Sequence, residues 1–213
     1  MRIISGEFKR RKLLANPGDT TRPITDRAKE TLFNHISESI KEKHVADIFA
    51  GTGSMGIEAL SRGAKTCVFF EKDKAAADLL RLNLETLSVK DRTLAWQTDI
   101  LRTSFKPKQV PHLVPFNYIF FDPPYEMAKI ITPGGKLYAA LERLGKPDVT
   151  LPGSRLIFRT TPEHVFKFPP AWQEERRFEL GTMLFIFYSS VQQLDSVETE
   201  VILPTEDQEV TEL

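Results

Sequence analysis

The segment VADIFAGTGSMG, residues 45–56, contains a short apolar strand, a glycine loop and the start of a helix. Glycine permits a tight turn in which backbone N–H groups approach a bound ligand. The helix is expected to run from Ile57 to Arg62 and to end at Gly63. A second apolar strand, Cys67 to Phe70, follows. This order predicts a doubly wound α/β sheet with a ligand at the glycine loop.

Polar residues around this loop indicate a nucleoside ligand. Glu71 ends the second strand, where an acidic side chain of a doubly wound sheet accepts hydrogen bonds from ribose hydroxyls. Gly51 and Gly53 belong to a GxGxxG pattern, which does not by itself identify the cofactor. Asp47 lies inside the first strand, where it can hold the loop or a ligand amino group. S-Adenosylmethionine has a ribose and an amino-acid end but no pyrophosphate, which suits a loop without lysine.

A third unit repeats this order of helix and strand. Residues 73–87 have helical spacing, and the strand Leu94–Trp96 comes next. Asp99 then follows, where it could accept a hydrogen bond from an adenine amine, while Ile100 packs on the ring. The alternative for Asp99 is a helix cap or an exposed turn.

Asp122-Pro123-Pro124-Tyr125 comes directly after the apolar strand Tyr118–Phe121. Proline fixes φ and donates no backbone hydrogen bond, so the neighbouring carbonyls are held in place. The Asp122 carboxylate and the Pro123 carbonyl can accept N–H bonds from an exocyclic amine while Tyr125 stacks on the base, a contact worth roughly 1–3 kcal/mol. These contacts would orient a weak nitrogen nucleophile toward an electrophile. The alternative is an ordinary strand exit in which Asp122 caps a turn.

The remaining elements complete the predicted fold. A helix is expected from Thr25 or Asp26 to about Lys41, another over residues 136–144, and a flap over residues 126–131. A fifth strand is expected over residues 155–159. The last two strands, 178–180 and 183–188, are joined so tightly that they predict an antiparallel hairpin at the sheet edge. We therefore expect a Rossmann-like, seven-stranded, mostly parallel sheet with an antiparallel last strand, and ligands at the carboxyl ends of its strands.

Charge is unevenly distributed along the chain, although the formal net charge of its 213 residues is zero. We expect a basic N-terminal β-hairpin extension over residues 1–25, a catalytic domain over residues 26–190 and an acidic tail over residues 191–213. The cations expected to contact a phosphate backbone are Lys9, Arg10, Arg11, Lys12, Arg22 and Arg27. A solvated run of charge is the alternative interpretation.

Composition excludes several classes of protein. Cys67 is the only cysteine, so no internal disulfide can form, and its apolar neighbours predict a core position. The four histidines lack metal-ligand spacing, and we expect no metal. No apolar stretch approaches the roughly 20 residues that span a bilayer. These features predict a cytoplasmic monomer without membrane contact.

Several motifs together resemble the RsmD family of bacterial methyltransferases, over about residues 2–188. Besides Gly6 and the basic run ending at Leu13, the matching segments are residues 21–27, 30–34, 47–53, 56–64 and 121–125. Thr52 stands where serine is more usual in the family. The loop before Phe116 and the acidic tail lie outside the resemblance.

The resemblance implies that a methyl group moves from S-adenosylmethionine to the exocyclic N2 amine of a guanine in small-subunit ribosomal RNA, free or in a subunit particle. It implies that Asp122, the Pro123 carbonyl and Tyr125 hold the guanine. It also implies that the cofactor is held by Gly51, Gly53, Glu71 and Asp99, and that the basic hairpin with Arg22 contacts RNA.

Three other functions remain open from the sequence. Asp-Pro-Pro-Tyr also suits an adenine-N6 methyltransferase of DNA or RNA, although no separate target-recognition domain is visible. A nicotinamide oxidoreductase would share the glycine loop. A non-catalytic RNA-binding protein could keep the same fold without turnover.

Overall fold

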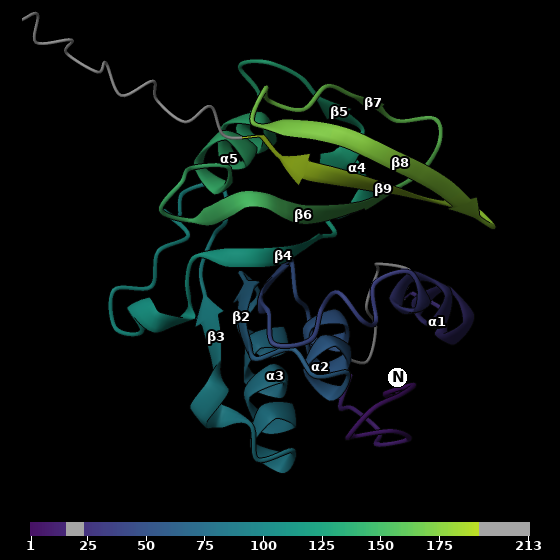
Figure 1. Ribbon diagram of the computed structural model, residues 1–213, viewed down its shortest axis with the longest axis vertical. Coiled ribbons are helices and arrows are strands. Elements are labelled where there is room, and N and C mark those ends of the chain that lie inside the picture. Colours follow the sequence, from purple (N-terminus) through teal and green to yellow (C-terminus); the bar gives the residue numbers. More distant parts are fainter. Residues whose placement is uncertain (16–23, 192–213) are drawn as a thin grey trace, which may run out of the picture.

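A computed structural model describes residues 1–15 and 24–191 (Figure 1). Seven strands form one sheet in the order β3-β2-β1-β4-β6-β9-β8. Their bounds are β1 His44–Ile48, β2 Thr66–Glu71, β3 Thr93–Gln97, β4 Phe116–Phe121, β6 Thr150–Thr160, β8 Trp172–Leu180 and β9 Met183–Ser190. Strands β3, β2, β1, β4 and β6 are parallel, and β9 runs antiparallel to β6 and β8. The predicted mostly parallel sheet with an antiparallel last strand is therefore confirmed.

Helices cover both faces of this sheet (Figure 1). The helices α1 (Asp26–Asn34), α2 (Ser54–Ser61) and α3 (Lys74–Thr86) pack on one face. The other face is covered by α4 (Tyr125–Ala128), α5 (Lys136–Leu144) and neighbouring loops. Two 3₁₀ turns, η1 (Lys90–Arg92) and η2 (Pro111–Leu113), precede β3 and β4. Among the described residues, no helix has the length and apolar character that a bilayer crossing requires.

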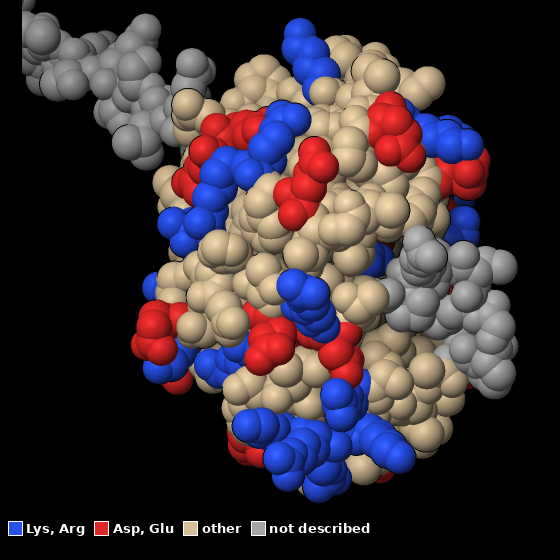
Figure 2. Space-filling view, turned by 90° about the vertical axis from the view of Figure 1, so that its right-hand side faces the viewer, with Lys and Arg blue, Asp and Glu red and all other residues tan. Residues whose placement is uncertain are grey.

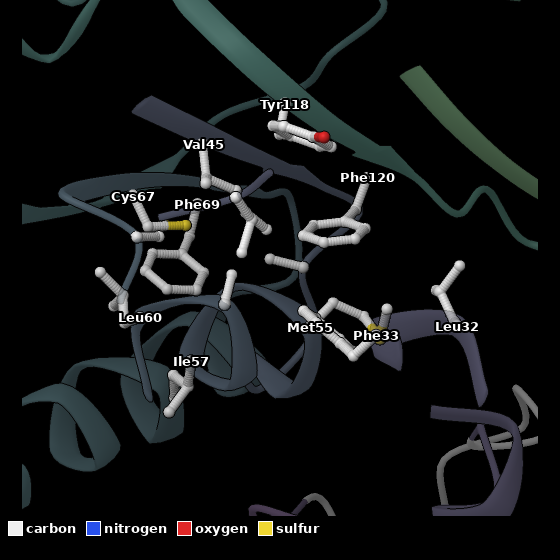
Figure 3. Packing of buried hydrophobic residues seen from close by; sticks show 14 of the residues in the cluster. Leu32, Phe33, Val45, Met55, Ile57, Leu60, Cys67, Phe69, Tyr118 and Phe120 are labelled. Carbon is white, nitrogen blue, oxygen red and sulfur yellow. The ribbon is translucent and has the colours of Figure 1, made fainter. Parts of the chain in front are cut away.

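Alternate residues along the strands point to opposite faces of the sheet and form a hydrophobic core on each face. Val45, Cys67 and Phe69 face the helix α2 in Figure 3, so the predicted core position of Cys67 is confirmed. Packing between α2 and the sheet requires Gly56, because a Cβ there would lie 2.3 Å from Phe69 Cε1 and 2.6 Å from Cys67 Sγ. The last glycine of the GxGxxG pattern therefore permits close helix–strand packing.

The helix α1 ends at Asn34, so the predicted extension to about Lys41 is wrong. Residues 35–42 form successive turns instead. The hydroxyl of Ser39 donates to the Ile36 carbonyl at 3.1 Å, and such side-chain bonds compete with a regular helix. Ile36 and Ile40 are nevertheless buried, which explains the apolar spacing that predicted a longer helix.

The N-terminal segment forms a loop in which Arg2 and Lys12 make one isolated antiparallel bridge, and no strand is assigned within residues 1–15. Its two arms pair through their backbones, with Ile3 N–H donating to the Arg11 carbonyl at 3.0 Å and Arg10 N–H to the Ile3 carbonyl at 2.9 Å, and its backbone also bonds to α2. The Glu58 carboxylate accepts from the backbone N–H groups of Ile4 and Ser5 at 2.8 Å and 3.1 Å. The segment is therefore hairpin-like and anchored on a helix, and the β-hairpin extension stays a prediction because no strand is assigned in it.

The C-terminal strands agree with the sequence. Leu180 pairs with Met183 across the Gly181–Thr182 turn, and β8 lies at the sheet edge, which confirms the predicted hairpin. The expected flap over 126–131 contains α4 and the strand β5 (Ile130–Ile131), which pairs with β7 (Val165–Phe166) in a separate two-stranded sheet. Arg22 and the acidic tail beyond Val191 lie outside the described residues.

Candidate active site

The strand order β3-β2-β1-β4 brings the predicted site segments into one row. Asp99 follows β3, Glu71 ends β2, the glycine loop follows β1, and Asp122 follows β4. Because these strands are parallel, all four carboxyl ends lie at the same edge of the sheet. Ligands of open α/β sheets bind at this edge.

Glu71 and the glycine loop are joined directly. One Glu71 oxygen accepts from the backbone N–H of Gly51 at 2.7 Å, and the other accepts from Asp73 N–H at 2.7 Å. Gly51 has a φ of 55° and no atom within 4 Å of its Cβ position, so its outer side is open. Each carboxylate oxygen can accept two hydrogen bonds, which leaves Glu71 able to bind ribose hydroxyls. This donor and acceptor set fits a nucleoside cofactor.

Asp47 supports the loop from beneath. Its side chain is 2% exposed and accepts from the backbone N–H of Gly56 at 2.8 Å. Burial raises the pKa of the Asp47 carboxyl well above its usual value, and the nearby charges of Asp122 and Glu71 raise it further. Of the two roles suggested by the sequence, the geometry matches holding the loop.

Asp99 is held by Lys72 and by its own turn. The Lys72 ammonium lies 3.0 Å from one carboxylate oxygen, and Leu101 N–H donates to the other at 3.0 Å. The hydrogen bond from Lys72 lowers the pKa of Asp99. Ile100 is 3% exposed within the core, so its contact with a cofactor ring remains a prediction.

Asp122 forms a two-pronged ion pair with Arg159, a residue that the sequence analysis did not select. Arg159 Nε donates to Asp122 Oδ1 at 2.8 Å, and Arg159 Nη2 lies 2.8 Å from Oδ2. Because Phe121 and Phe158 are register partners, the next residues, Asp122 and Arg159, emerge side by side from β4 and β6. In the sequence, Arg159 could have been recognised as a charged residue at the carboxyl end of a mostly apolar strand.

A pocket opens beside this ion pair on the face covered by α1 and α2. Apolar side chains form most of its wall, and the pair supplies its charged part. The lining residues are Ile24, Leu32, Met55, Phe120, Phe121, Asp122, Ile157, Arg159 and Phe185. The pocket therefore places the Asp122 carboxylate and the Arg159 guanidinium beside apolar side chains.

Pro123 and Tyr125 lie at the start of α4. The Pro124 carbonyl accepts from Met127 and Ala128 at 2.8 Å and 3.1 Å, whereas no described residue donates to the Pro123 carbonyl. The Tyr125 ring is partly exposed and makes an edge contact with His164, with ring centroids 6.1 Å apart. An acceptor oxygen and an aromatic ring thus remain available beside Asp122.

The predicted RNA-binding cations lie apart from this edge. Lys9, Arg10, Arg11 and Lys12 are exposed, and the blue patch at the lower end of Figure 2 corresponds to the end where the N-terminus lies in Figure 1. Arg11 donates to the carbonyl of Thr86 at 3.1 Å, at the last residue of α3. Helices that follow parallel strands end at the opposite edge of the sheet. Only an extended ligand can therefore contact both the patch and Asp122. Arg27 is exposed on α1.

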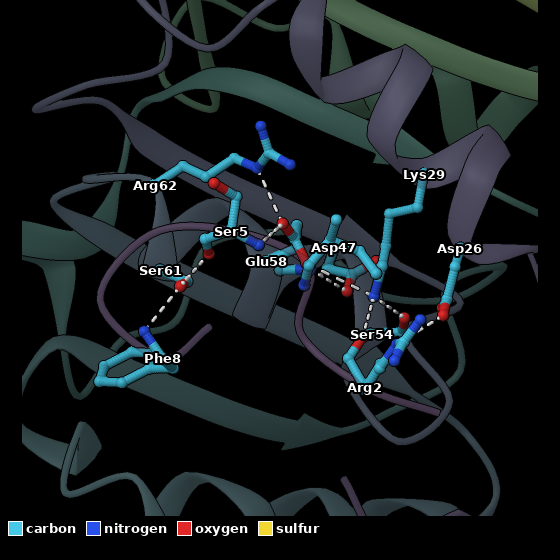
Figure 4. Close-up of polar contacts among 12 residues, drawn as sticks. Arg2, Ser5, Phe8, Asp26, Lys29, Asp47, Ser54, Glu58, Ser61 and Arg62 are labelled. Atoms are coloured by element: carbon cyan, nitrogen blue, oxygen red, sulfur yellow. Dashed lines mark hydrogen bonds and ion pairs between the residues drawn. The ribbon is translucent and has the colours of Figure 1, made fainter. Parts of the chain in front are cut away.

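A second buried ion cluster links the N-terminal segment to α1 and α2 (Figure 4). Glu58 is completely buried and accepts from Ile4, Ser5 and Arg62, with the Lys29 ammonium 3.5 Å away. Lys29 also donates to the Arg2 carbonyl at 2.7 Å and to Ser54 Oγ at 3.2 Å. Its members come from distant segments, so no local sequence pattern predicts this cluster.

Comparison with known proteins identifies the family and the fold. The family model described as conserved hypothetical protein 95 matches residues 1–189. A relative from Haemophilus influenzae strain Rd, named ribosomal RNA small subunit methyltransferase D, is 40% identical over 130 residues. That alignment covers 59% of this chain and 64% of the relative, so it spans less than two thirds of the relative's length.

Solved structures share the architecture. The yhhF protein of Escherichia coli superposes with a TM-score of 0.72 and 28% identity, over 91% of this chain and 99% of that one. An RNA methyltransferase from Salinibacter ruber, solved with S-adenosyl-L-homocysteine, gives a TM-score of 0.58 over 82% of this chain and 97% of that one. Its 13% identity shows the fold alone. Since the family model matches almost the whole described sequence, the chain belongs to the RsmD family of S-adenosylmethionine-dependent ribosomal RNA methyltransferases, which its motifs resemble.

Proposed function

We propose that this chain methylates the exocyclic N2 amine of a guanine in small-subunit ribosomal RNA. The observation that carries the proposal is the position of Asp122, beside an apolar pocket and one strand away from the glycine loop. Family membership and the named function of the Haemophilus influenzae relative support the RNA substrate and the cofactor.

The cofactor would supply an activated methyl group on a sulfonium. In our proposal Glu71 binds its ribose, Asp99 its adenine amine, and the backbone of Gly51 and Gly53 its remaining polar groups, while Asp47 holds the loop in shape. Ile100 would pack on the adenine ring. These assignments agree with the open side of Gly51 and the spare acceptor capacity of Glu71.

Asp122 and the Pro123 carbonyl would each accept one N–H bond from the guanine amine. The nitrogen lone pair then points along the line of methyl transfer, and the carboxylate stabilises the positive charge that develops on nitrogen. A nitrogen–carbon bond forms as the carbon–sulfur bond breaks, and the amine then loses a proton to solvent. Tyr125 would stack on the base, and no covalent enzyme intermediate is required.

The RNA would reach beyond the pocket to the basic N-terminal segment. Lys9, Arg10, Arg11 and Lys12 would bind phosphates at the far end of α2, while Arg27 would contact RNA nearer the start of α1. Arg22, which lies outside the described residues, would also contact RNA. An eight-residue helix spans about 12 Å, so a folded RNA or a small-subunit particle can bridge the two sites. We propose that the protein acts as a monomer in the cytoplasm, where its substrate is made.

Methyl transfer from labelled S-adenosylmethionine tests the proposal. The substrates are small ribosomal subunits, naked ribosomal RNA and duplex DNA, and the modified base is then identified by mass spectrometry. We expect N2-methylguanine in ribosomal RNA, and Asp122→Ala should abolish transfer while calorimetry shows nearly unchanged cofactor affinity. Equal loss of transfer and cofactor binding would mean that Asp122 is structural.

The adenine alternative gives a different product. Methylation of adenine N6, in RNA or DNA, would overturn the proposed base while keeping the role of Asp122 as an amine acceptor. Absence of transfer to any nucleic acid, with intact cofactor binding, would instead favour a non-catalytic RNA-binding role.

A further inference from the structure

We propose that Arg159 is the positioning residue of the active site, because it holds the Asp122 carboxylate in the one orientation that accepts the target amine. The inference rests on the proposed function and adds a residue that neither the motifs nor the family comparison assigns. It is drawn from the paired contact between β4 and β6 and from the pocket beside it.

The contact geometry fixes the carboxylate in rotation as well as position. Arg159 Nε donates to Asp122 Oδ1 at 2.8 Å, and Arg159 Nη2 forms an ion pair with Oδ2 at 2.8 Å, so the planar guanidinium contacts both carboxylate oxygens. A single hydrogen bond would let the carboxylate turn about its bond to Cβ, whereas the two-pronged arrangement does not. Each oxygen retains a lone pair, so Asp122 can still accept from an amine in the pocket.

Arg159 is built into a rigid and largely dry position. Its side chain is 11% exposed, compared with 23% for Asp122. Burial lowers the pKa of Arg159, but the charge of Asp122 and the hydrogen bond to it together outweigh burial. The pKa is therefore raised, and the guanidinium stays charged. Its remaining nitrogen, Nη1, contacts only the Met183 sulfur, at 3.7 Å, among the described residues.

A purely structural role, such as joining β4 to β6, would not require Arg159. Strands β4 and β6 are already joined by a ladder of register pairs from Tyr118–Arg155 to Phe121–Phe158. The ion pair lies beyond the last of these pairs, at the edge where the pocket opens. A charged residue at this point therefore affects the pocket more directly than it affects the pairing of the two strands.

Substitution of Arg159 in the full-length protein tests this role. Arg159→Met removes the hydrogen bond, the second contact and the charge, and Arg159→Lys keeps the charge but loses the two-point contact. We expect kcat for methyl transfer to fall about 100-fold in Arg159→Met, as misplacement of a reacting group does, and to recover partly in Arg159→Lys. The dissociation constant for S-adenosylmethionine, measured by calorimetry, should change less than about threefold because the cofactor contacts lie on β1 to β3.

Arg155 provides a matched control on the same strand and the same face. It contacts Tyr118 Oη at 3.3 Å and Glu175 at 3.6 Å and has no contact with Asp122. Arg155→Met should therefore leave kcat within about threefold of the wild type. Thermal unfolding of all variants shows whether each remains folded at the assay temperature.

An Asp122→Asn background separates positioning from stability. If Arg159 acts through the carboxylate, adding Arg159→Met to Asp122→Asn should lower kcat by less than about twofold beyond Asp122→Asn alone. A full 100-fold loss in that background, or equal loss in the Arg155→Met control, would overturn the inference. Failure of the wild type to methylate RNA would overturn the proposed function instead, so the two outcomes are distinct.

Discussion

Two ion clusters lie on the same face of the sheet, and they differ in how completely their hydrogen bonds are used. The Glu58–Lys29 pair is closed: the two side chains are 0% and 1% exposed, although Nη2 of the neighbouring Arg62 is buried without a hydrogen-bond partner among the described residues. Four donors surround the two oxygens of Glu58, and three acceptors surround the Lys29 ammonium. The Asp122–Arg159 pair, by contrast, borders a pocket and keeps free lone pairs.

The difference separates a structural charge from one available for chemistry. A buried ion whose bonding capacity is filled can only hold segments together, here the N-terminal segment, α1 and α2. An ion pair with spare acceptors beside an apolar pocket can bind a polar ligand group. Burial alone therefore does not identify a functional charge. Spare acceptors that border a pocket do, whereas the unpaired Arg62 Nη2 belongs to a residue that does not line the pocket.

Glu58→Ala should give the largest loss of stability. It leaves the Lys29 ammonium, the Arg62 guanidinium and two backbone N–H groups without their shared acceptor. We expect the free energy of unfolding to fall by about 3–5 kcal/mol, the usual cost of breaking a buried ion pair. Urea unfolding measures this loss, and a loss below about 1 kcal/mol would contradict the closed-cluster interpretation.

Asp122→Asn, in contrast to Glu58→Ala, should lower methyl transfer much more than it lowers stability. The amide keeps the shape of the side chain but offers one acceptor oxygen and carries no charge. We expect methyl transfer to slow by about 10²–10³-fold, as when one preorganised charge-stabilising group is lost, while unfolding free energy falls by only about 1 kcal/mol. A variant as unstable as Glu58→Ala, with normal turnover of its folded fraction, would remove the distinction between the two clusters.

Comparing the pH dependence of stability in Lys29→Met and in the wild type tests whether Lys29 titrates as a buried member of the closed cluster. Burial lowers the pKa of Lys29 below its usual 10.5, so the unfolded chain binds more protons than the folded protein between the lowered value and 10.5. Stability conferred through Lys29 therefore rises with pH across that window. Relative to Lys29→Met, the wild type should gain unfolding free energy as pH rises toward 10.5, measured by urea unfolding at several pH values. A constant difference would show that Lys29 titrates normally.

Neutralising the N-terminal patch should give the smallest effect on the enzyme itself. Lys9→Gln, Arg10→Gln and Lys12→Gln change exposed side chains and should leave stability and cofactor affinity unchanged. In binding to ribosomal RNA, the slope of log affinity against log salt should decrease by about 0.7–0.9 for each lost phosphate contact. An unchanged slope would show that this patch is a solvated charge run, the alternative that the sequence left open.

The sequence alone determined the order of elements and the position of the motifs. Strand, glycine loop and helix at residues 45–62, and the strand ending in Asp122, follow from local patterns of apolar, glycine and proline residues. The tight Gly181–Thr182 link determined the closing hairpin for the same reason. Such features depend on neighbours in the chain, so they can be read without knowing what packs against them.

Tertiary structure alone decided which charges meet. Asp122 and Arg159 are 37 residues apart and become neighbours only because β4 and β6 pair in parallel. Glu58 collects partners from residues 4, 5 and 29 because the N-terminal segment and α1 pack on α2. Contacts of this kind depend on sheet order and packing, and local sequence patterns predict neither of these.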